Sequence, residues 1–206
     1  NLKISIDLMG GDNSPDKTID GIELFLKRNN NINDCFFYLF GDKNVVEKKI
    51  HKLKFLKNNF ELIDTKIVVA NNLPPLSAIK KGKNSSMWKS IESQISMDSD
   101  VSLSAGNTGV LLVMSKMILK TLDDVDKPAL AGLWPNKSNM NVVLDLGANI
   151  ECNEKNLVDF SEMGSALYQS LYPNDKAVVA LLNIGSEEIK GTEILKNTYS
   201  KLKVLD

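Results

Sequence analysis

The hydrophobic and polar positions of this chain follow two periods in turn, and the alternation predicts strands separated by helices. Short, nearly continuous apolar runs have the length and composition of buried strands. They lie at residues 2–9, 35–40, 60–64 with 66–70, 101–103, 129–134, 140–146 and 177–183. Between them, apolar residues recur every three or four positions, as in Ile19, Ile22 and Leu26, which predicts helices with one buried face.

The predicted helices alternate with the predicted strands along the whole sequence. They cover residues 15–28, 41–53, 110–122, 156–171 and 188–202, and the part of residues 78–97 that follows a lysine-rich segment. Regular alternation of this kind is typical of a doubly wound, Rossmann-like α/β/α sandwich with a mostly parallel sheet. A chain of 206 residues that is 43% hydrophobic can bury one sizeable core, so we expect a single α/β domain over residues 1–206.

Charge and cysteine content exclude several classes of protein. A formal net charge of -1 gives no reason to expect a nucleic-acid groove, so any anion site must be local. Two cysteines without CxxC spacing argue against structural zinc and favour a reducing compartment. No apolar run has the length of a membrane span, and no metal site or cofactor is expected.

The stretch VSLSAGNTG at residues 101–109 predicts a strand, a tight turn and the start of a helix. Asn107 and Thr108 are residue types that cap the first turn of a helix. A helix N-terminus gathers backbone N–H groups and the positive end of the helix dipole, so an anion could be held there without a lysine. The expected ligand groups are those of Ser104, Gly106, Asn107 and Thr108.

Three other predicted strands end in similar turns. The first strand leads into Gly10, Gly11, Asp12 and Asn13, and later strands lead into turns at residues 147–149 and 184–187. The carboxyl ends of parallel strands share one edge of a sheet, and ligands bind in the crevice outside that edge. We therefore expect all four turns to converge on one site.

The polar groups expected at this edge are mostly amides, hydroxyls and N–H donors, with a few carboxylates. Such a set can hold a phosphate and polarise a carbonyl, but it is poorly equipped to supply its own nucleophile. The single histidine, His51, lies among lysines on the solvent side of a predicted helix, which disfavours Ser-His-Asp and Cys-His mechanisms. No HExxH, Walker GxxxxGK[ST] or complete GxGxxG motif is present.

Several residues near this edge have alternative interpretations. Asp7 and Asp145 end predicted strands, where their carboxylates could instead accept backbone N–H groups and fix neighbouring loops. Ser85 and Ser86 follow a lysine-rich segment at a predicted helix start, which is either a second anion contact or a solvated turn. Cys152 raises the alternative of an acyl-cysteine intermediate, although no basic or helical feature nearby in the sequence would activate its thiol as a nucleophile.

Five sequence blocks in order carry a resemblance to a known family. They are IDLMGGD at 6–12, KNSSM at 83–87, VSLSAGNTG at 101–109, LDLGAN at 144–149, and LLNIG at 181–185 followed by Glu187, Lys190 and Gly191. With these blocks the chain resembles the phosphate acyltransferase family of bacterial phospholipid synthesis. The family usually has histidine after Met-Gly-Gly-Asp, where this chain has Asn13.

The resemblance implies transfer of a fatty acyl group from acyl carrier protein to inorganic phosphate. The acyl phosphate product would serve a membrane glycerol-3-phosphate acyltransferase. The resemblance also implies a fold related to isocitrate and isopropylmalate dehydrogenases and to phosphotransacetylases, a homodimer, and a location in the cytoplasm or at the inner face of the membrane. It further implies that residues 1–206 are the N-terminal major part of a longer chain.

Residues and resemblance together lead to one hypothesis for the site. The turns at residues 10–13 and 104–108 hold phosphate, while Asn149, Asn183 and Lys190 face the thioester carbonyl or the remaining phosphate charge. Asp7, Asp145, Glu187, Ser85 and Ser86 support these groups. Two alternatives remain: a phosphotransacetylase that uses acyl coenzyme A, and a noncatalytic phosphate-binding module.

Overall fold

The computed structural model describes residues 1–206 except 30–33, 51–58, 71, 138, 188 and 206. It divides into two compact units, Asn1–Lys120 and Thr121–Asp206, which are described separately. The prediction of one continuous domain stays a prediction. The prediction for His51 concerns a residue outside the described ranges.

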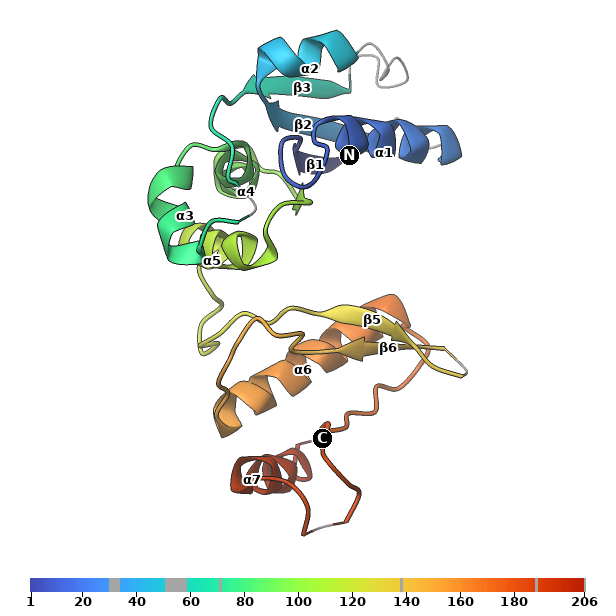
Figure 1. The fold of residues 1–206 in the computed structure, drawn as a ribbon. Helices are drawn as coiled ribbons and strands as arrows, with labels where there is room; N and C mark the ends of the chain where they lie inside the picture. Colours follow the sequence, from blue (N-terminus) through green and yellow to red (C-terminus); the bar gives the residue numbers. More distant parts are fainter. Residues whose placement is uncertain (30–33, 51–58, 71, 138, 188, 206) are drawn as a thin grey trace. The chain divides into compact units, whose positions relative to one another are not determined.

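The first unit is built on a four-stranded parallel sheet (Figure 1). Its strands are β1 (Leu2–Asp7), β2 (Cys35–Gly41), β3 (Phe60–Asp64) and β4 (Val101–Ser104), in the order β3-β2-β1-β4. In the register, Ile6 lies opposite Leu39 on one side and Leu103 on the other. All carboxyl ends therefore lie at one edge, as the apolar runs predicted.

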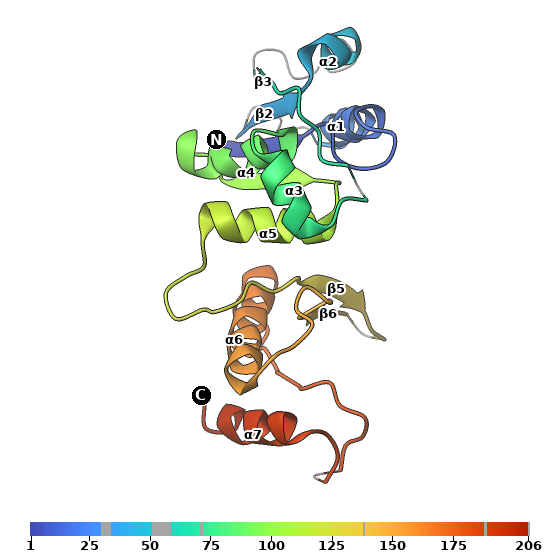
Figure 2. The ribbon, with the colours of Figure 1, turned by 60° about the vertical axis from the view of Figure 1, so that its left-hand side comes forward.

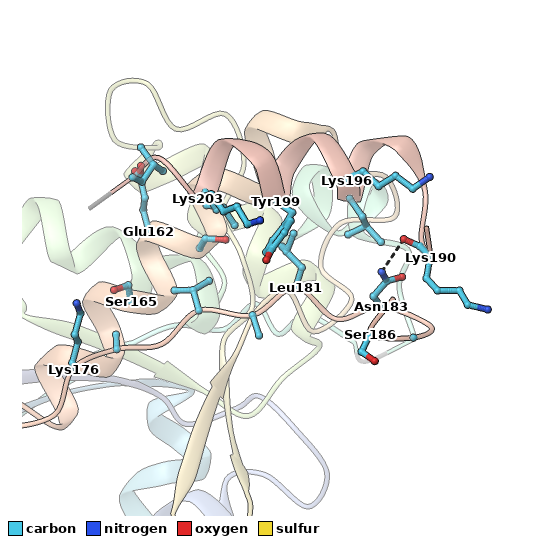
Figure 3. A pocket seen from close by; sticks show the side chains of 18 of the residues that line it. Glu162, Ser165, Lys176, Leu181, Asn183, Ser186, Lys190, Lys196, Tyr199 and Lys203 are labelled. Carbon is cyan, nitrogen blue, oxygen red and sulfur yellow. Dashed lines mark hydrogen bonds between the residues drawn. The ribbon is translucent and has the colours of Figure 1, made fainter. Parts of the chain in front are cut away.

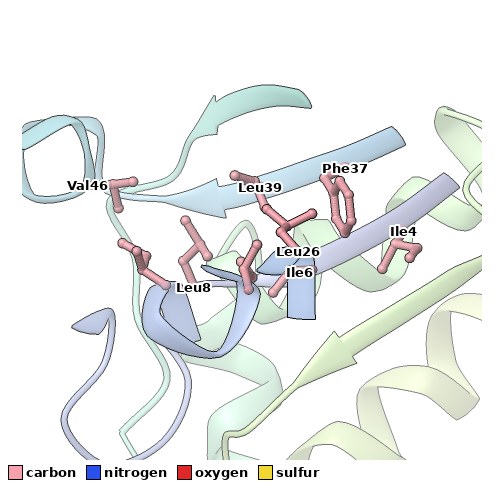
Figure 4. Packing of buried hydrophobic residues seen from close by; sticks show 9 residues of the cluster. Ile4, Ile6, Leu8, Leu26, Phe37, Leu39 and Val46 are labelled. Carbon is pink, nitrogen blue, oxygen red and sulfur yellow. The ribbon is translucent and has the colours of Figure 1, made fainter. Parts of the chain in front are cut away.

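Helices α1 (Asp16–Arg28) and α2 (Lys43–Ile50) cover one face of this sheet. Ile19, Ile22 and Leu26 of α1 are buried against inward-facing strand residues, and Val46 of α2 joins the same cluster (Figure 4). Side chains of a strand alternate between faces, so Ile4, Ile6 and Leu8 can all contribute to this core. The apolar face predicted for α1 is thus the face that packs against the sheet.

Helices α3 (Pro75–Gly82), α4 (Ser86–Ser96) and α5 (Thr108–Leu119) form a second layer (Figure 2). Beneath α4, Ser5 of β1 is fully buried and its Oγ is 2.5 Å from the Oγ of Ser93. Within residues 78–97 the sequence predicted an amphipathic helix that follows a lysine-rich segment, and α4 confirms it; the separate helix α3 before that segment was not predicted. Asn84 has a φ of 65°, which a right-handed helix does not allow, and a new helix begins after it.

The second unit contains a two-stranded antiparallel sheet of β5 (Gly132–Pro135) and β6 (Met140–Val143). Helix α6 (Glu154–Leu171) contacts both β6 and helix α7 (Glu193–Leu202). Asn153 caps α6 by accepting the N–H of Asn156 at 2.9 Å, and Thr192 caps α7. The final helix therefore begins at Glu193, later than the predicted residue 188.

Residues 177–183 were predicted to form a strand, and this prediction is wrong for the described structure. The segment lies outside regular secondary structure, and Val178 and Leu182 are each 91% exposed. A strand forms only where a second strand satisfies its N–H and C=O groups, and the described part of the second unit places none beside this segment. Residues 66–70 likewise form only a single bridge, between Ile67 and Ser85.

Candidate anion site

Two glycine-bearing turns meet at the carboxyl edge of the first unit's sheet. Strands β1 and β4 are neighbours, so the turns that follow them are adjacent. A methyl group placed on Gly10 would lie 2.8 Å from Ser104 Oγ and 2.9 Å from the backbone nitrogen of Gly106. At Gly11, where φ is 90°, the same group would lie 2.5 Å from the carbonyl oxygen of Ala105. Only residues without a side chain fit this closely.

The carboxylate of Asp7 joins the two turns. Its Oδ1 accepts the N–H groups of Met9 and Gly10, each at 3.1 Å, and its Oδ2 accepts the hydroxyl of Ser104 at 2.7 Å. Ser104 Oγ in turn accepts the N–H of Gly106 at 3.1 Å. Asp7 is only 1% exposed, so these bonds form away from solvent. Of the two interpretations of Asp7, the structure favours the one in which it fixes the turns.

Helix α5 begins directly at this junction. Asn107 caps it, its Oδ1 accepting the N–H of Val110 at 3.0 Å, as the sequence predicted. The first N–H groups of an α-helix have no acceptor within the helix, and they carry the positive end of its dipole. An anion outside Gly106 and Thr108 would therefore meet backbone donors without a lysine.

Helix α4 begins beside the same turns. Ser85 caps it by accepting the N–H of Trp88 at 3.1 Å, and both Ser85 and Ser86 are buried. The methyl group of Met87 lies 2.5 Å from the position of a Cβ on Gly106. From the sequence, Met87 was predicted only as a core residue of the helix. Its place in the KNSSM block was the signal that it lies next to the helix start.

The structure thus brings together the predicted phosphate-binding residues of the first unit, with Ser85 and Ser86 nearby. Asp12 and Asn13 lie on the exposed part of the first turn, and Asn13 has a φ of 58°. Asparagine tolerates this left-handed conformation better than most residues. The turns at residues 147–149 and 184–187 belong to the second unit, so convergence of all four turns stays a prediction.

In the second unit, Asp145 and Asn149 form a closed hydrogen-bonded turn. Asp145 Oδ1 accepts the N–H of Leu130 at 2.8 Å, and its Oδ2 accepts the backbone N–H of Asn149 at 2.7 Å. The side-chain nitrogen of Asn149 donates to the carbonyl oxygen of Pro128 at 2.9 Å and to Asp145 at 3.0 Å. Contact of this amide with a thioester would require one of these bonds to be exchanged.

The same hydrogen bonds change the acidity of Asp145. Partial burial tends to raise the pKa of its carboxyl group, but the donated bonds from Leu130, Asn149 and Ala148 outweigh it, and the pKa is lowered. The carboxylate is therefore favoured in the folded state. This assigns Asp145 to the loop-fixing role that the sequence left open.

A pH titration of stability should detect this carboxylate. A lowered folded-state pKa contributes stability above the unfolded-state value of about 4, and this contribution disappears as pH falls through the folded-state pKa. We therefore expect urea-unfolding free energies of the protein and of Asp145→Asn to converge as the pH drops from about 5 to about 2. The exposed Asp175→Asn is the matched control. A difference that does not depend on pH would contradict the assignment.

Asn183 fixes a second loop of this unit. Its Oδ1 accepts the N–H of Ile184 at 2.8 Å, and its Nδ2 donates to the carbonyl oxygen of Lys190 at 3.2 Å (Figure 3). Lys190 is exposed, and its ammonium group points away from the Asn183 amide. Both residues line a hollow of ≈ 1320 Å³ between α6, α7 and residues 176–187, together with Gly185 and Glu187. Their catalytic roles stay predictions.

The described residues contain no group of three or more His, Cys, Asp or Glu side chains that could hold a metal ion. Within those same ranges, no helix is both long and apolar enough to cross a membrane.

The fold is that of an α/β protein in which two glycine-bearing turns and the starts of helices α4 and α5 meet at the carboxyl edge of a parallel sheet. Residues 2–206 match the model of a family described as "Fatty acid synthesis protein". The chain belongs to this family.

Curated relatives agree with the family match. The chain is 57% identical over 201 residues to the phosphate acyltransferase of Pelagibacter ubique (strain HTCC1062), covering 98% of this chain and 59% of the relative. It is 39% identical to the phosphate acyltransferase of Rhodospirillum rubrum, covering 98% of this chain and 57% of the relative. The chain therefore spans less than two thirds of the length of these relatives.

A solved structure supports the fold. The EutD phosphotransacetylase from Staphylococcus aureus superposes with a TM-score of 0.60 at 18% sequence identity, covering 98% of this chain and 65% of that chain. The likeness confirms the predicted relation to the phosphotransacetylase fold. At this level of identity it concerns the fold alone.

Proposed function

We propose that this protein is a phosphate acyltransferase that moves a fatty acyl group from acyl carrier protein to inorganic phosphate. The observation that carries the proposal is the 57% identity to a protein named phosphate acyltransferase over 98% of this chain. The meeting of the turns at Gly10 and Gly106 supports it, because it offers backbone donors to an oxyanion.

The chemistry suits a site without a histidine base. Inorganic phosphate near neutral pH is already a nucleophile, and a thioester is an activated acyl donor. A phosphate oxygen attacks the carbonyl carbon, the carbon–sulfur bond breaks, and the phosphate proton passes to the departing thiolate. The products are an acyl phosphate and the free carrier thiol. The protein's task is to orient phosphate and to stabilise the oxyanion that forms on the carbonyl.

The remaining parts of the proposal follow from family membership. The protein acts as a cytoplasmic homodimer, meets acyl carrier protein, and delivers its product to a glycerol-3-phosphate acyltransferase at the membrane. Asn149, Asn183 and Lys190 are proposed to face the reacting carbonyl, and residues 10–13 and 104–108 to hold phosphate.

The direct test is an assay for acyl phosphate, trapped with hydroxylamine, from palmitoyl acyl carrier protein and phosphate. It should be run on residues 1–206 and on the complete gene product. Product that depends on both substrates supports the proposal. Phosphate binding by calorimetry without any product would favour the noncatalytic alternative.

A second candidate is transfer from acyl coenzyme A to phosphate. It would use the same phosphate-holding turns at Gly10 and Gly106, so the geometry of the first unit serves either acyl donor. Donor competition separates the two functions: a higher kcat/KM with short-chain acyl coenzyme A than with palmitoyl acyl carrier protein would replace the proposed donor.

Direct attack by phosphate also predicts that no thiol is needed. Cys152→Ala should retain acyl phosphate formation within about twofold, because direct attack by phosphate forms no bond to the half-buried Cys152 thiol. The assay above measures this effect. Loss of turnover in a folded Cys152→Ala protein would restore the acyl-cysteine alternative.

A further inference from the structure

A second feature of the first unit lies beside the anion site, between helix α1 and the sheet. It is a pocket of ≈ 480 Å³, within the range of roughly 300–1,000 Å³ typical of small-molecule sites. Its lining is mostly apolar: Ile4, Ile6, Phe37 and Leu103 from the strands, and Ile22 and Phe25 from α1.

The pocket exists because β4 carries apolar side chains that α1 does not cover. Val101 and Leu103 pair with Ile4 and Ile6, so they belong to the same face as the core. Yet Leu103 is 49% exposed and Val101 is 36% exposed, whereas Ile4 and Ile6 are buried. Gly21 of α1 widens the gap, since a Cβ placed there would have no neighbour within 4 Å.

One end of the pocket lies at the carboxyl ends of β1 and β4, where the two glycine-bearing turns begin. Asp7, Ser104 and Ala105 line it, and Asp7 and Ser104 are the residues that join the two glycine-bearing turns. Lys17 and Thr18, in the first turn of α1, also line the pocket. The apolar residues Phe25 and Ile4 lie farther from the turns along their helix and strand.

From this position we infer that the pocket binds the hydrocarbon chain of a fatty acyl substrate, with its carbonyl end toward the two glycine-bearing turns. The inference rests on the proposed function. An acyl group attacked by a phosphate held at the turns would place its chain against the nearest apolar surface. Each methylene removed from water strengthens binding roughly fourfold, so even part of a long chain in the pocket would favour long donors over short ones.

Gly21→Phe tests the inference, because its ring would occupy the open space beside Leu103. The complete gene product should be assayed with palmitoyl and octanoyl acyl carrier proteins. We expect the KM for the palmitoyl donor to rise roughly tenfold relative to the octanoyl donor, equivalent to about two methylenes displaced. Leu24→Phe is the matched control, since Leu24 is on the same helix, 48% exposed and absent from the pocket lining. Gly21→Leu provides a smaller replacement if the phenylalanine variant does not fold.

A binding measurement that needs no turnover separates this inference from the proposed function. The fluorescent fatty acid cis-parinarate should bind the unchanged protein and the Leu24→Phe variant, and bind Gly21→Phe at least roughly tenfold more weakly. Absence of acyl phosphate with this binding pattern would refute the proposed function but not the pocket. Equal changes for both donors, or cis-parinarate binding that Gly21→Phe leaves unaltered, would overturn the pocket. The same holds if cis-parinarate fails to bind the unchanged protein, which would point to another segment of the polypeptide in this space.

Discussion

Gly10→Ala should lower acyl phosphate formation on the order of a hundredfold while the protein remains folded. The new methyl group would touch Asp7 Oδ2 and lie 2.8 Å from Ser104 Oγ and 2.9 Å from the nitrogen of Gly106. Asp7 Oδ2 and Ser104 Oγ are hydrogen-bonded to each other, and the nitrogen of Gly106 is a backbone atom. None of the three can rotate away from the new methyl group while this bond is kept, so the two turns must move apart. Overpacking of this kind costs about 1–3 kcal/mol of stability, and a displacement of about 1 Å in a site lowers turnover on the order of a hundredfold.

The measurement is hydroxylamine-trapped acyl phosphate together with thermal unfolding. Gly164→Ala, in helix α6, is the matched control. Its added methyl group would meet only the side chain of Leu144, at 3.1 Å. We expect that control to keep its turnover. A Gly10→Ala protein with unchanged phosphate KM and kcat would show that the close contact between the turns is not part of the site.

The sequence predicted the elements whose signals are local. The spacing of Ile19, Ile22 and Leu26 placed α1, and those residues are buried in the structure. The same-edge rule for parallel strands placed Gly10 beside Gly106, although 96 positions separate them. In both cases one regular period, or one topological rule, was sufficient.

The sequence failed where structure depends on a partner or on a single backbone angle. Residues 177–183 have the composition of a buried strand, but a strand also needs a neighbour, which composition does not report. The break between α3 and α4 depends on Asn84 in the left-handed region. Asparagine adopts that angle only in some contexts, so the sequence predicted the amphipathic helix after the lysine-rich segment but not the separate helix α3 before it.

In the candidate site, too, the sequence predicted the residues with local signals and failed for those whose role depends on their hydrogen-bond partners. The residue types of Asn149 and Asn183 suit carbonyl polarisation, but their amides hydrogen-bond the surrounding loops in the second unit. Short polar side chains commonly bond to nearby backbone, and sequence does not show which bonds win. Asn107 is different, because a cap position just before a helix is itself a local signal.

Asn107→Asp should separate the two roles of that residue. Aspartate caps a helix as well as asparagine does, and a negative charge at a helix N-terminus is favourable, so the unfolding temperature should not fall. A phosphate at the same N-terminus, however, would face a new negative charge. At about 5 Å and an effective dielectric constant of about 20, the repulsion is about 3 kcal/mol, which raises the phosphate KM on the order of a hundredfold.

Asn107→Ser is the control, because serine keeps the cap to Val110 without adding charge. Its phosphate KM should therefore change far less than that of Asn107→Asp. Phosphate KM at saturating acyl donor, and the unfolding temperature of each variant, are the quantities to measure. If the aspartate variant keeps its phosphate KM, the anion does not bind at the start of α5, because no arrangement of the cap hides a full charge from a phosphate within one helical turn.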